Sequence, residues 1–137
     1  MVMKNSIYSI EFTEEQLRCT ARALEFYSRF LAGQWRIPDA MQHKEYEVQN
    51  KPEDFWDKRN YIEDQLNVLS VMFTGMPPHG SYGIGHKNLE EDAKTSYDIY
   101  RPILEELVGK NADSWNVYSS PGLSYSKEGR IKVNVLL

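Results

Sequence analysis

The residues best suited to chemistry lie in one stretch of the sequence, residues 75–94, which reads GMPPHGSYGIGHKNLEEDAK. In a pocket, the ring of Tyr82 could stack on a planar ligand, and His79 or His86 could donate hydrogen bonds to it. The alternative is purely structural: two prolines end one helix, the glycines allow a tight path, and Asn88 begins the next helix. Residue types alone leave both interpretations open.

Other kinds of site find little support in the sequence. The glycines match neither common phosphate-binding motif, and Glu90, Glu91 and Asp92 would repel a phosphate from the start of the following helix. The histidines lack the spacing of a metal site, and no motif marks a nucleophile. We therefore assign no catalytic residue, no metal and no cofactor.

A set of arginines gives a second candidate feature. Arg18, Arg22 and Arg29 fall within about 40° of one another on a helix, so they share one edge. Arginine recognises carboxylates and phosphates, although simple pairing with Glu14 and Glu25 would explain the same edge. Together with nearby polar and aromatic residues, this edge suggests one wall of a polar pocket. The candidate ligand-binding residues are Tyr27, Arg29, Gln34, Trp35, His79, Ser81, Tyr82, His86 and Arg101.

Three helices would position these residues. Thr13 and Gln16 form a capping box that starts a helix over residues 14–31. A second helix is expected from Pro52 to near Gly75. A third is expected after Asn88, which serves as its N-cap with Glu91, and Pro102 should kink or divide it.

Both ends of the chain show the alternation of strands. SIYSIEF near the N-terminus and RIKVNVLL at the C-terminus alternate apolar and polar residues. We expect the last strand to bury one face through Ile131, Val133, Val135 and Leu137. The fold class predicted is therefore α+β and mainly helical: three main helices with a small antiparallel sheet made from the N- and C-termini. The 137 residues suit a single domain over 1–137.

The second helix is apolar on two flanks, which indicates a place at the centre of the fold or in a subunit interface. For the second case the candidate interface residues are Val68, Val71 and Met72, and the protein is expected to form a homo-oligomer.

Composition limits the partners. The net charge is −4 and the pI about 5.4, which disfavours binding to duplex nucleic acid. Cys19 is the only cysteine, so no internal disulfide is expected. The sequence has neither the pattern of a signal peptide nor an apolar run long enough to span a membrane. We expect a cytoplasmic protein without a membrane partner.

Two segments, FTEEQLRCTARALEFYSRFLAGQW and SYGIGHKNLEEDAKTSYDIYRPI, resemble small uncharacterised proteins encoded by bacteriophages and prophages. The resemblance rests on SYGI (Ser81 to Ile84) followed by SYDIY (Ser96 to Tyr100), where alanine is expected in place of Ser96. It covers about the first three quarters of the chain, and the part from about Asp113 departs from the pattern. It implies a phage or mobile-element context and the host cytoplasm, and it transfers no functional residue.

Three functions remain open. The first is a noncatalytic phage-type accessory protein that binds a small polar or nucleotide-like ligand and sequesters a host signal. The second is a protein-interaction module or homo-oligomer that inhibits a host protein. The third, a small hydrolase, is supported only by the presence of histidines and carboxylates.

Overall fold

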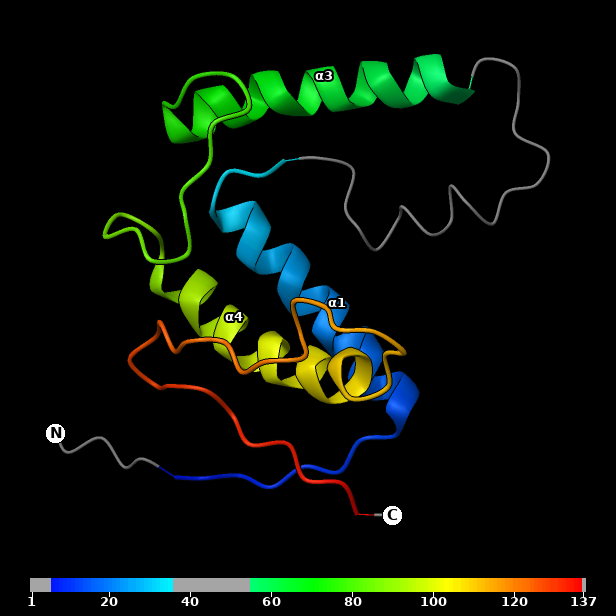
Figure 1. Cartoon of the computed structure of the whole chain (residues 1–137). Coiled ribbons are helices and arrows are strands. Elements are labelled where there is room, and N and C mark those ends of the chain that lie inside the picture. The colour runs from blue at the N-terminus through cyan, green and yellow to red at the C-terminus, as the bar shows by residue number, and fades with distance from the viewer. Residues whose placement is uncertain (1–5, 36–54, 137) are drawn as a thin grey trace, which may run out of the picture.

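The computed structural model describes residues 6–35 and 55–136. Within them lie the three helices that the sequence predicts: α1 (Glu14–Leu31), α3 (Phe55–Thr74) and α4 (Glu91–Leu104), and a π-helical turn, Glu105–Gly109, continues α4. The start predicted for the second helix, Pro52, lies outside the described residues. α1 and α4 lie side by side, and α3 stands apart from this pair, near the C-terminal end of α1 (Figure 1).

α1 begins where its capping box predicts. Thr13 Oγ1 accepts a hydrogen bond from the backbone N–H of Gln16 at 3.2 Å, and Gln16 Oε1 accepts one from the Thr13 N–H at 2.9 Å. These two bonds satisfy amides that the first turn of a helix would otherwise leave unpaired. The predicted start at Glu14 and end at Leu31 are both confirmed.

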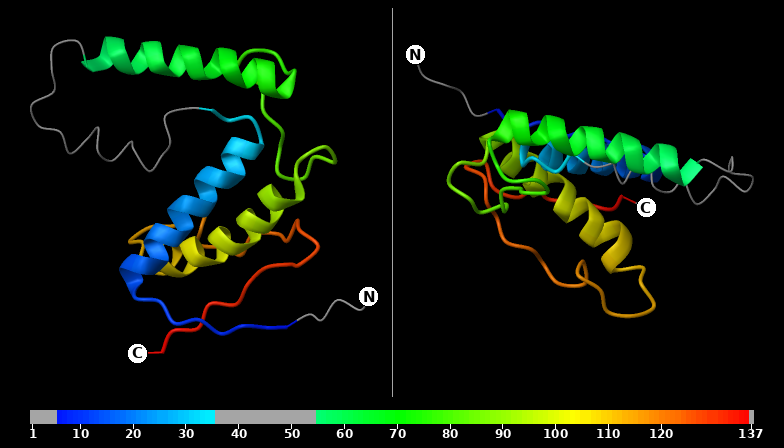
Figure 2. Two further views of the ribbon diagram at one scale, coloured as in Figure 1. Left: turned by 180° about the vertical axis from the view of Figure 1, so that it is seen from behind. Right: turned by 90° about the horizontal axis from the view of Figure 1, so that it is seen from above.

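The pairing of α1 with α4 forms the core. Ala21, Tyr100, Ile103 and Leu107 are buried together. Further along, the small side chain of Ala93 has no exposed surface, and its carbonyl accepts a hydrogen bond of 2.8 Å from Ser28 Oγ on α1. Small residues at this crossing leave room for the two backbones, and the view from behind shows α1 and α4 side by side (Figure 2).

The start and middle of α4 differ from the prediction. Glu90, not Asn88, occupies the N-cap position, and the Asn88 N–H instead donates to His86 Nδ1 at 3.0 Å within the preceding turn. Pro102 lies inside α4 rather than dividing it. Because proline has no N–H, the carbonyl of Asp98, four residues earlier, loses its usual helical partner. That carbonyl accepts a hydrogen bond from the Ile131 N–H at 3.2 Å.

Three carboxylates spaced seven residues apart on α4 and its π-helical turn hold the C-terminal segment, residues 111–136. We call Glu91, Asp98 and Glu105 the carboxylate row. Glu105 accepts the N–H of residue 122 at 2.9 Å, Asp98 accepts the N–H groups of residues 125 and 126 at 3.1 and 2.7 Å, and Glu91 accepts that of residue 127 at 2.8 Å. Residues 122–127 therefore run antiparallel to α4, and the chain then turns back, because Arg130 binds Glu105 and the Ile131 N–H binds the Asp98 carbonyl.

Glu105 also binds two arginines. Arg101 Nε donates to it at 3.0 Å, and both terminal nitrogens of Arg130 donate to its two oxygens. Burial by itself would raise the pKa of the Glu105 carboxyl, but the hydrogen bonds from Arg130 and Gly122 and the charge of Arg130 outweigh it. The pKa therefore lies below its ordinary value of 4.5.

The predicted antiparallel sheet is wrong: the described residues contain no strand. The C-terminal segment binds side-chain carboxylates where a strand would bind a neighbouring backbone. The alternation of apolar and polar residues in this segment buries little apolar surface, since Val133 packs on the core whereas Val135 is 67% exposed. The N-terminal segment is also exposed, with Ile7 98% and Tyr8 82% accessible. The α+β assignment is thus corrected to an all-helical fold with an extended C-terminal segment.

Replacing Asp98 with alanine should destabilise the protein by about 2–4 kcal/mol, because the amides of Tyr125 and Ser126 lose a charged acceptor in a partly buried setting. Urea unfolding measures the loss, and hydrogen exchange should quicken at those two amides. Asp113→Ala, at an exposed position, is the matched control. Unchanged exchange at both amides would contradict the role given to Asp98.

The lowered pKa of Glu105 predicts a defined acid response. A carboxyl with a folded pKa below its unfolded value stabilises the fold above the unfolded value, about 4.5, and this stabilisation is lost as the pH falls through the folded pKa. Glu105→Gln should lower the free energy of unfolding at neutral pH and make its decline in acid shallower. Urea unfolding over a pH series tests this, with Glu11→Gln on the exposed N-terminal segment as the control; equal slopes for wild type and Glu105→Gln would contradict it.

Candidate functional site

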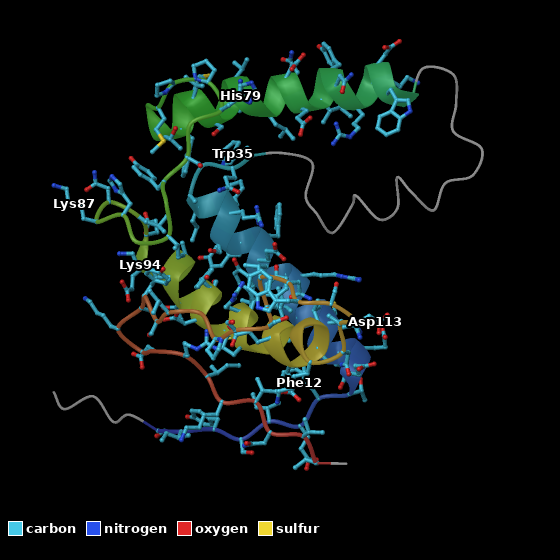
Figure 3. All side chains as sticks on the ribbon, viewed as in Figure 1. Phe12, Trp35, His79, Lys87, Lys94 and Asp113 are labelled. Atoms are coloured by element: carbon cyan, nitrogen blue, oxygen red, sulfur yellow. The ribbon has the colours of Figure 1, made fainter. Side chains whose placement is uncertain are left out.

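The candidate site is a cavity of about 220 Å³ between the end of α1, the inner side of α3 and the loop that follows α3. Figure 3 labels Trp35 and His79, which lie on its two sides. Three residues predicted from the sequence therefore meet here, Gln34, Trp35 and His79. The complete lining within the described residues is Gly33, Gln34, Trp35, Glu63, Asn67, His79 and Gly80.

Gly33 brings α1 and α3 together at this cavity. Its φ of +92° lies in the left-handed region, where glycine avoids the strain of a side chain. A Cβ atom at Gly33 would lie 2.9 Å from Thr74 Cγ2 of α3. Ser70 Oγ donates to the Gly33 carbonyl at 2.7 Å. Ser70 is the buried contact of α3 with the end of α1.

Trp35 forms an aromatic wall. Its indole Nε1 donates to the Phe30 carbonyl at 3.0 Å, and its ring stacks on Phe30 with centroids 4.6 Å apart. The Trp35 ring also packs against Phe73 of α3 at 5.2 Å. The indole is therefore held by both helices, and its N–H is already used.

The polar walls are held in place by hydrogen bonds. The His79 N–H donates to Asn67 Oδ1 at 2.8 Å, and His79 has a positive φ of 62°, which is uncommon for a residue with a side chain. Gln34 Oε1 accepts from Arg29 Nη1 at 3.1 Å, while Arg29 pairs with Glu25 at 2.9 Å. With both amide oxygens used as acceptors, the NH₂ groups of Gln34 and Asn67 are suited to donate to a ligand.

The charge at the cavity disfavours an anionic ligand. The charged residue in its lining is Glu63, whose carboxylate pairs with Arg59 at 3.1 Å. Arg29 lies one hydrogen bond away, behind Gln34. The arrangement combines amide donors, a carboxylate, an imidazole and an indole, which suits hydrogen bonding to a flat polar molecule more than to a phosphate.

Several predicted ligand residues lie outside this cavity. Tyr27 donates to Asp92 Oδ2 at 2.9 Å, a hydrogen bond that raises the pKa of its hydroxyl. The Tyr82 ring packs 4.8 Å from His86, and the Tyr82 N–H donates to the Ala32 carbonyl at 2.9 Å. Tyr27 therefore links α1 to α4, and Tyr82 links the loop to the end of α1. Ser81 is exposed.

Arg101 belongs to a different part of the molecule. It is 9% exposed, pairs with Glu105 and donates to the Val117 carbonyl. Its guanidinium lies 4.6 Å from the centroid of the Tyr118 ring. Arg101 therefore anchors the C-terminal segment and does not line the cavity.

The predicted interface residues divide between the two sides of α3. Val68 is 54% and Met72 77% exposed, whereas Val71 is half-buried on the inner side. We define the outer face of α3 by its exposed residues Tyr61, Ile62, Gln65, Val68, Leu69 and Met72.

Sequence reasoning missed Glu63, Asn67 and Ser70. These residues recur at helical spacing and place a polar stripe on the inner side of α3. The apolar stripes of the same helix predicted an apolar inward side, as is normal for a surface helix, so the sequence did not point to this polar stripe.

The described residues contain no cluster of three His, Cys, Asp or Glu side chains arranged to hold a metal ion. None of the helices in this part of the chain combines the length and apolarity needed to cross a bilayer. Comparison with protein-family models, with curated proteins and with solved structures found no match to the chain.

Replacing Ser70 with alanine should loosen α3 from α1, because the Gly33 carbonyl loses its partner at a buried contact. The expected cost is about 1–2 kcal/mol, with faster hydrogen exchange along α3 than along α1. Ser81→Ala, at an exposed position, is the control and should change neither quantity. Equal exchange in α1 and α3 after Ser70→Ala would contradict this account of the junction.

Proposed function

We propose that this chain is a noncatalytic binding protein that holds a small, flat, polar ligand in the cavity beside Trp35. The observation that carries the proposal is the convergence of Gln34, Trp35 and His79 from separate segments on one cavity of about 220 Å³. Aromatic and hydrogen-bonding groups around a concave space are typical of small-molecule sites.

The size and charge of the cavity narrow the ligand class. Drug-sized pockets measure about 300–1,000 Å³, so this cavity suits a single heterocyclic ring system. Glu63 favours a neutral or cationic ring with N–H donors over a phosphate. Of a nucleotide-like molecule, the base is the part that fits this chemistry.

The biological setting of the proposal comes from the resemblance to phage and prophage proteins. In that setting, retention of a host signalling molecule in the cytoplasm, without turnover, would be the useful activity. The proposal assigns no catalytic residue.

Native mass spectrometry of the protein purified gently from cells tests the proposal directly. A bound molecule released on denaturation is expected, and titration with nucleobases and nucleosides should reproduce its binding. His79→Asn removes the imidazole at a position with positive φ that asparagine tolerates, and it should weaken binding by about tenfold. Glu63→Gln should weaken the binding of cationic rings more than the binding of neutral rings.

Trp35→Leu should abolish retention of the bound molecule. Trp115→Leu is its matched control, since Trp115 is 75% exposed on the C-terminal segment. Retention that survives both Trp35→Leu and His79→Asn in folded protein would place the ligand elsewhere. A chain that binds none of these compounds and carries no extra mass would overturn the proposal.

A second candidate function, that of a protein-interaction module that inhibits a host protein, is favoured by the exposure of the apolar outer face of α3. In this function the cavity is a by-product of the α1–α3 junction. The two candidates differ in the surface that a loss-of-function variant must alter.

A further inference from the structure

α3 does not sort its polar and apolar side chains as a surface helix usually does. Toward the rest of the molecule it turns the polar residues Ser70, Glu63, Asn67 and Thr74, which are buried or half-buried, and Leu66 and Val71 are half-buried beside them. Toward solvent it turns its outer face, where Tyr61 is 65% and Met72 77% exposed. A surface helix normally buries its apolar side, and none of the residues that the structure describes covers the outer face, which indicates a contact beyond them.

The outer face is continuous. At 100° per residue its members fall within about 120° of one another, with Gln65 at the centre. Their exposed fractions are 65% for Tyr61, 51% for Ile62, 54% for Val68, 49% for Leu69 and 77% for Met72. These five side chains expose roughly 600 Å² per chain, so two copies of the face reach the lower end of the 1,200–2,000 Å² buried in stable interfaces.

We propose that the occupant of the outer face is a second copy of this chain, paired through antiparallel α3 helices about a two-fold axis at Gln65. This inference does not depend on the ligand proposal. In this register Tyr61 meets Leu69 of the second copy, and Ile62 meets Val68. Tyr61, Ile62, Val68 and Leu69 then each gain an apolar neighbour.

Gln65 favours a second copy over an unrelated apolar surface. A glutamine at the centre of an apolar interface loses water and must find a partner. A side-chain amide has one donor side and one acceptor side, so two glutamines related by a two-fold axis satisfy each other. A single polar residue in such a seam also fixes the register and the number of helices.

Lys58 and the helix ends favour the antiparallel direction. Lys58 lies at one end of the outer face, and the last turn of α3 contains no basic residue. In an antiparallel pair, Lys58 lies beside Met72 of the second copy, near the C-terminal end of that helix, where a positive charge is stabilising. In a parallel pair, two Lys58 side chains would meet and the helix dipoles would repel each other.

Sedimentation velocity of the full chain across a wide concentration range tests the pairing. Wild type is expected as a dimer. Gln65→Glu, which keeps the size of the side chain, places two like charges at the axis and should raise the dimer dissociation constant by at least about thirtyfold. Leu69→Glu should act in the same direction.

Asn60→Glu, on the opposite side of α3, is the matched control and should leave the dimer intact. Circular dichroism and thermal unfolding show whether each variant folds. A wild-type monomer at the highest concentration, or a dimer that Gln65→Glu leaves unchanged, overturns the inference. Neither result bears on ligand retention at the cavity, which is measured separately.

Disulfide crosslinking in a Cys19→Ala background decides whether the two α3 helices pair in the antiparallel or the parallel direction. Mixed Lys58→Cys and Met72→Cys proteins should form a disulfide with each other. Met72→Cys alone should not, since two Met72 positions in the antiparallel pair lie about 21 Å apart along the helices, beyond the reach of a disulfide. Efficient self-crosslinking of Met72→Cys would show a parallel pair and overturn the proposed geometry.

Discussion

The hydrogen bonds between backbone amides of the C-terminal segment and the carboxylate row of α4 are the constraint on which this fold depends. Asp98 has no exposed surface, and a buried carboxylate is tolerated only when its oxygens are fully used. Here they accept from the amides and hydroxyl groups of residues 124–126. The requirement is mutual, because those amides have no neighbouring strand. A segment without regular structure is thereby held against α4 by side-chain acceptors in place of a neighbouring strand.

Pro102 reinforces the same arrangement from the backbone. By removing one helical N–H it leaves the Asp98 carbonyl to bind Ile131. Asp98 therefore binds the C-terminal segment through both its side chain and its main chain. What seemed a helix-breaking residue in the sequence serves as the source of a tertiary hydrogen bond.

The helices could be predicted because their signals are local. The Thr13–Gln16 capping box and the Pro77-Pro78 pair act on their own turn and need no distant partner. The sheet could not be predicted correctly, because alternation reports the direction of side chains and not the partner of each backbone amide. Glu91, Asp98 and Glu105 are seven residues apart in the sequence, but solvent-exposed acidic residues on a helix can have the same spacing. The spacing therefore does not predict their role.

The candidate site divides in the same way. Gln34, Trp35 and His79 were nominated because aromatic and polar residues follow a helix end and a proline pair. Glu63 and Asn67 were not predicted, because the inward side of α3 was expected to be apolar. Arg101 was nominated for a cleft, yet its charge balances Glu105 beneath the C-terminal segment. The type of each side chain indicated which residues could form polar contacts. The packing of the helices was needed to show which of them line the cavity and which, like Arg101, pair with another residue of the fold.

The carboxylate row has a consequence for the order of folding. Its three acceptors line up only once α4 is helical, so the C-terminal segment has no binding surface in the unfolded chain. The packing of α4 against α1 supplies that surface, so the attachment of the segment depends on the helix pair. The dependence does not run the other way in full, because the α1–α4 core also has contacts of its own, and detachment of the segment is therefore expected as a partial opening of the fold.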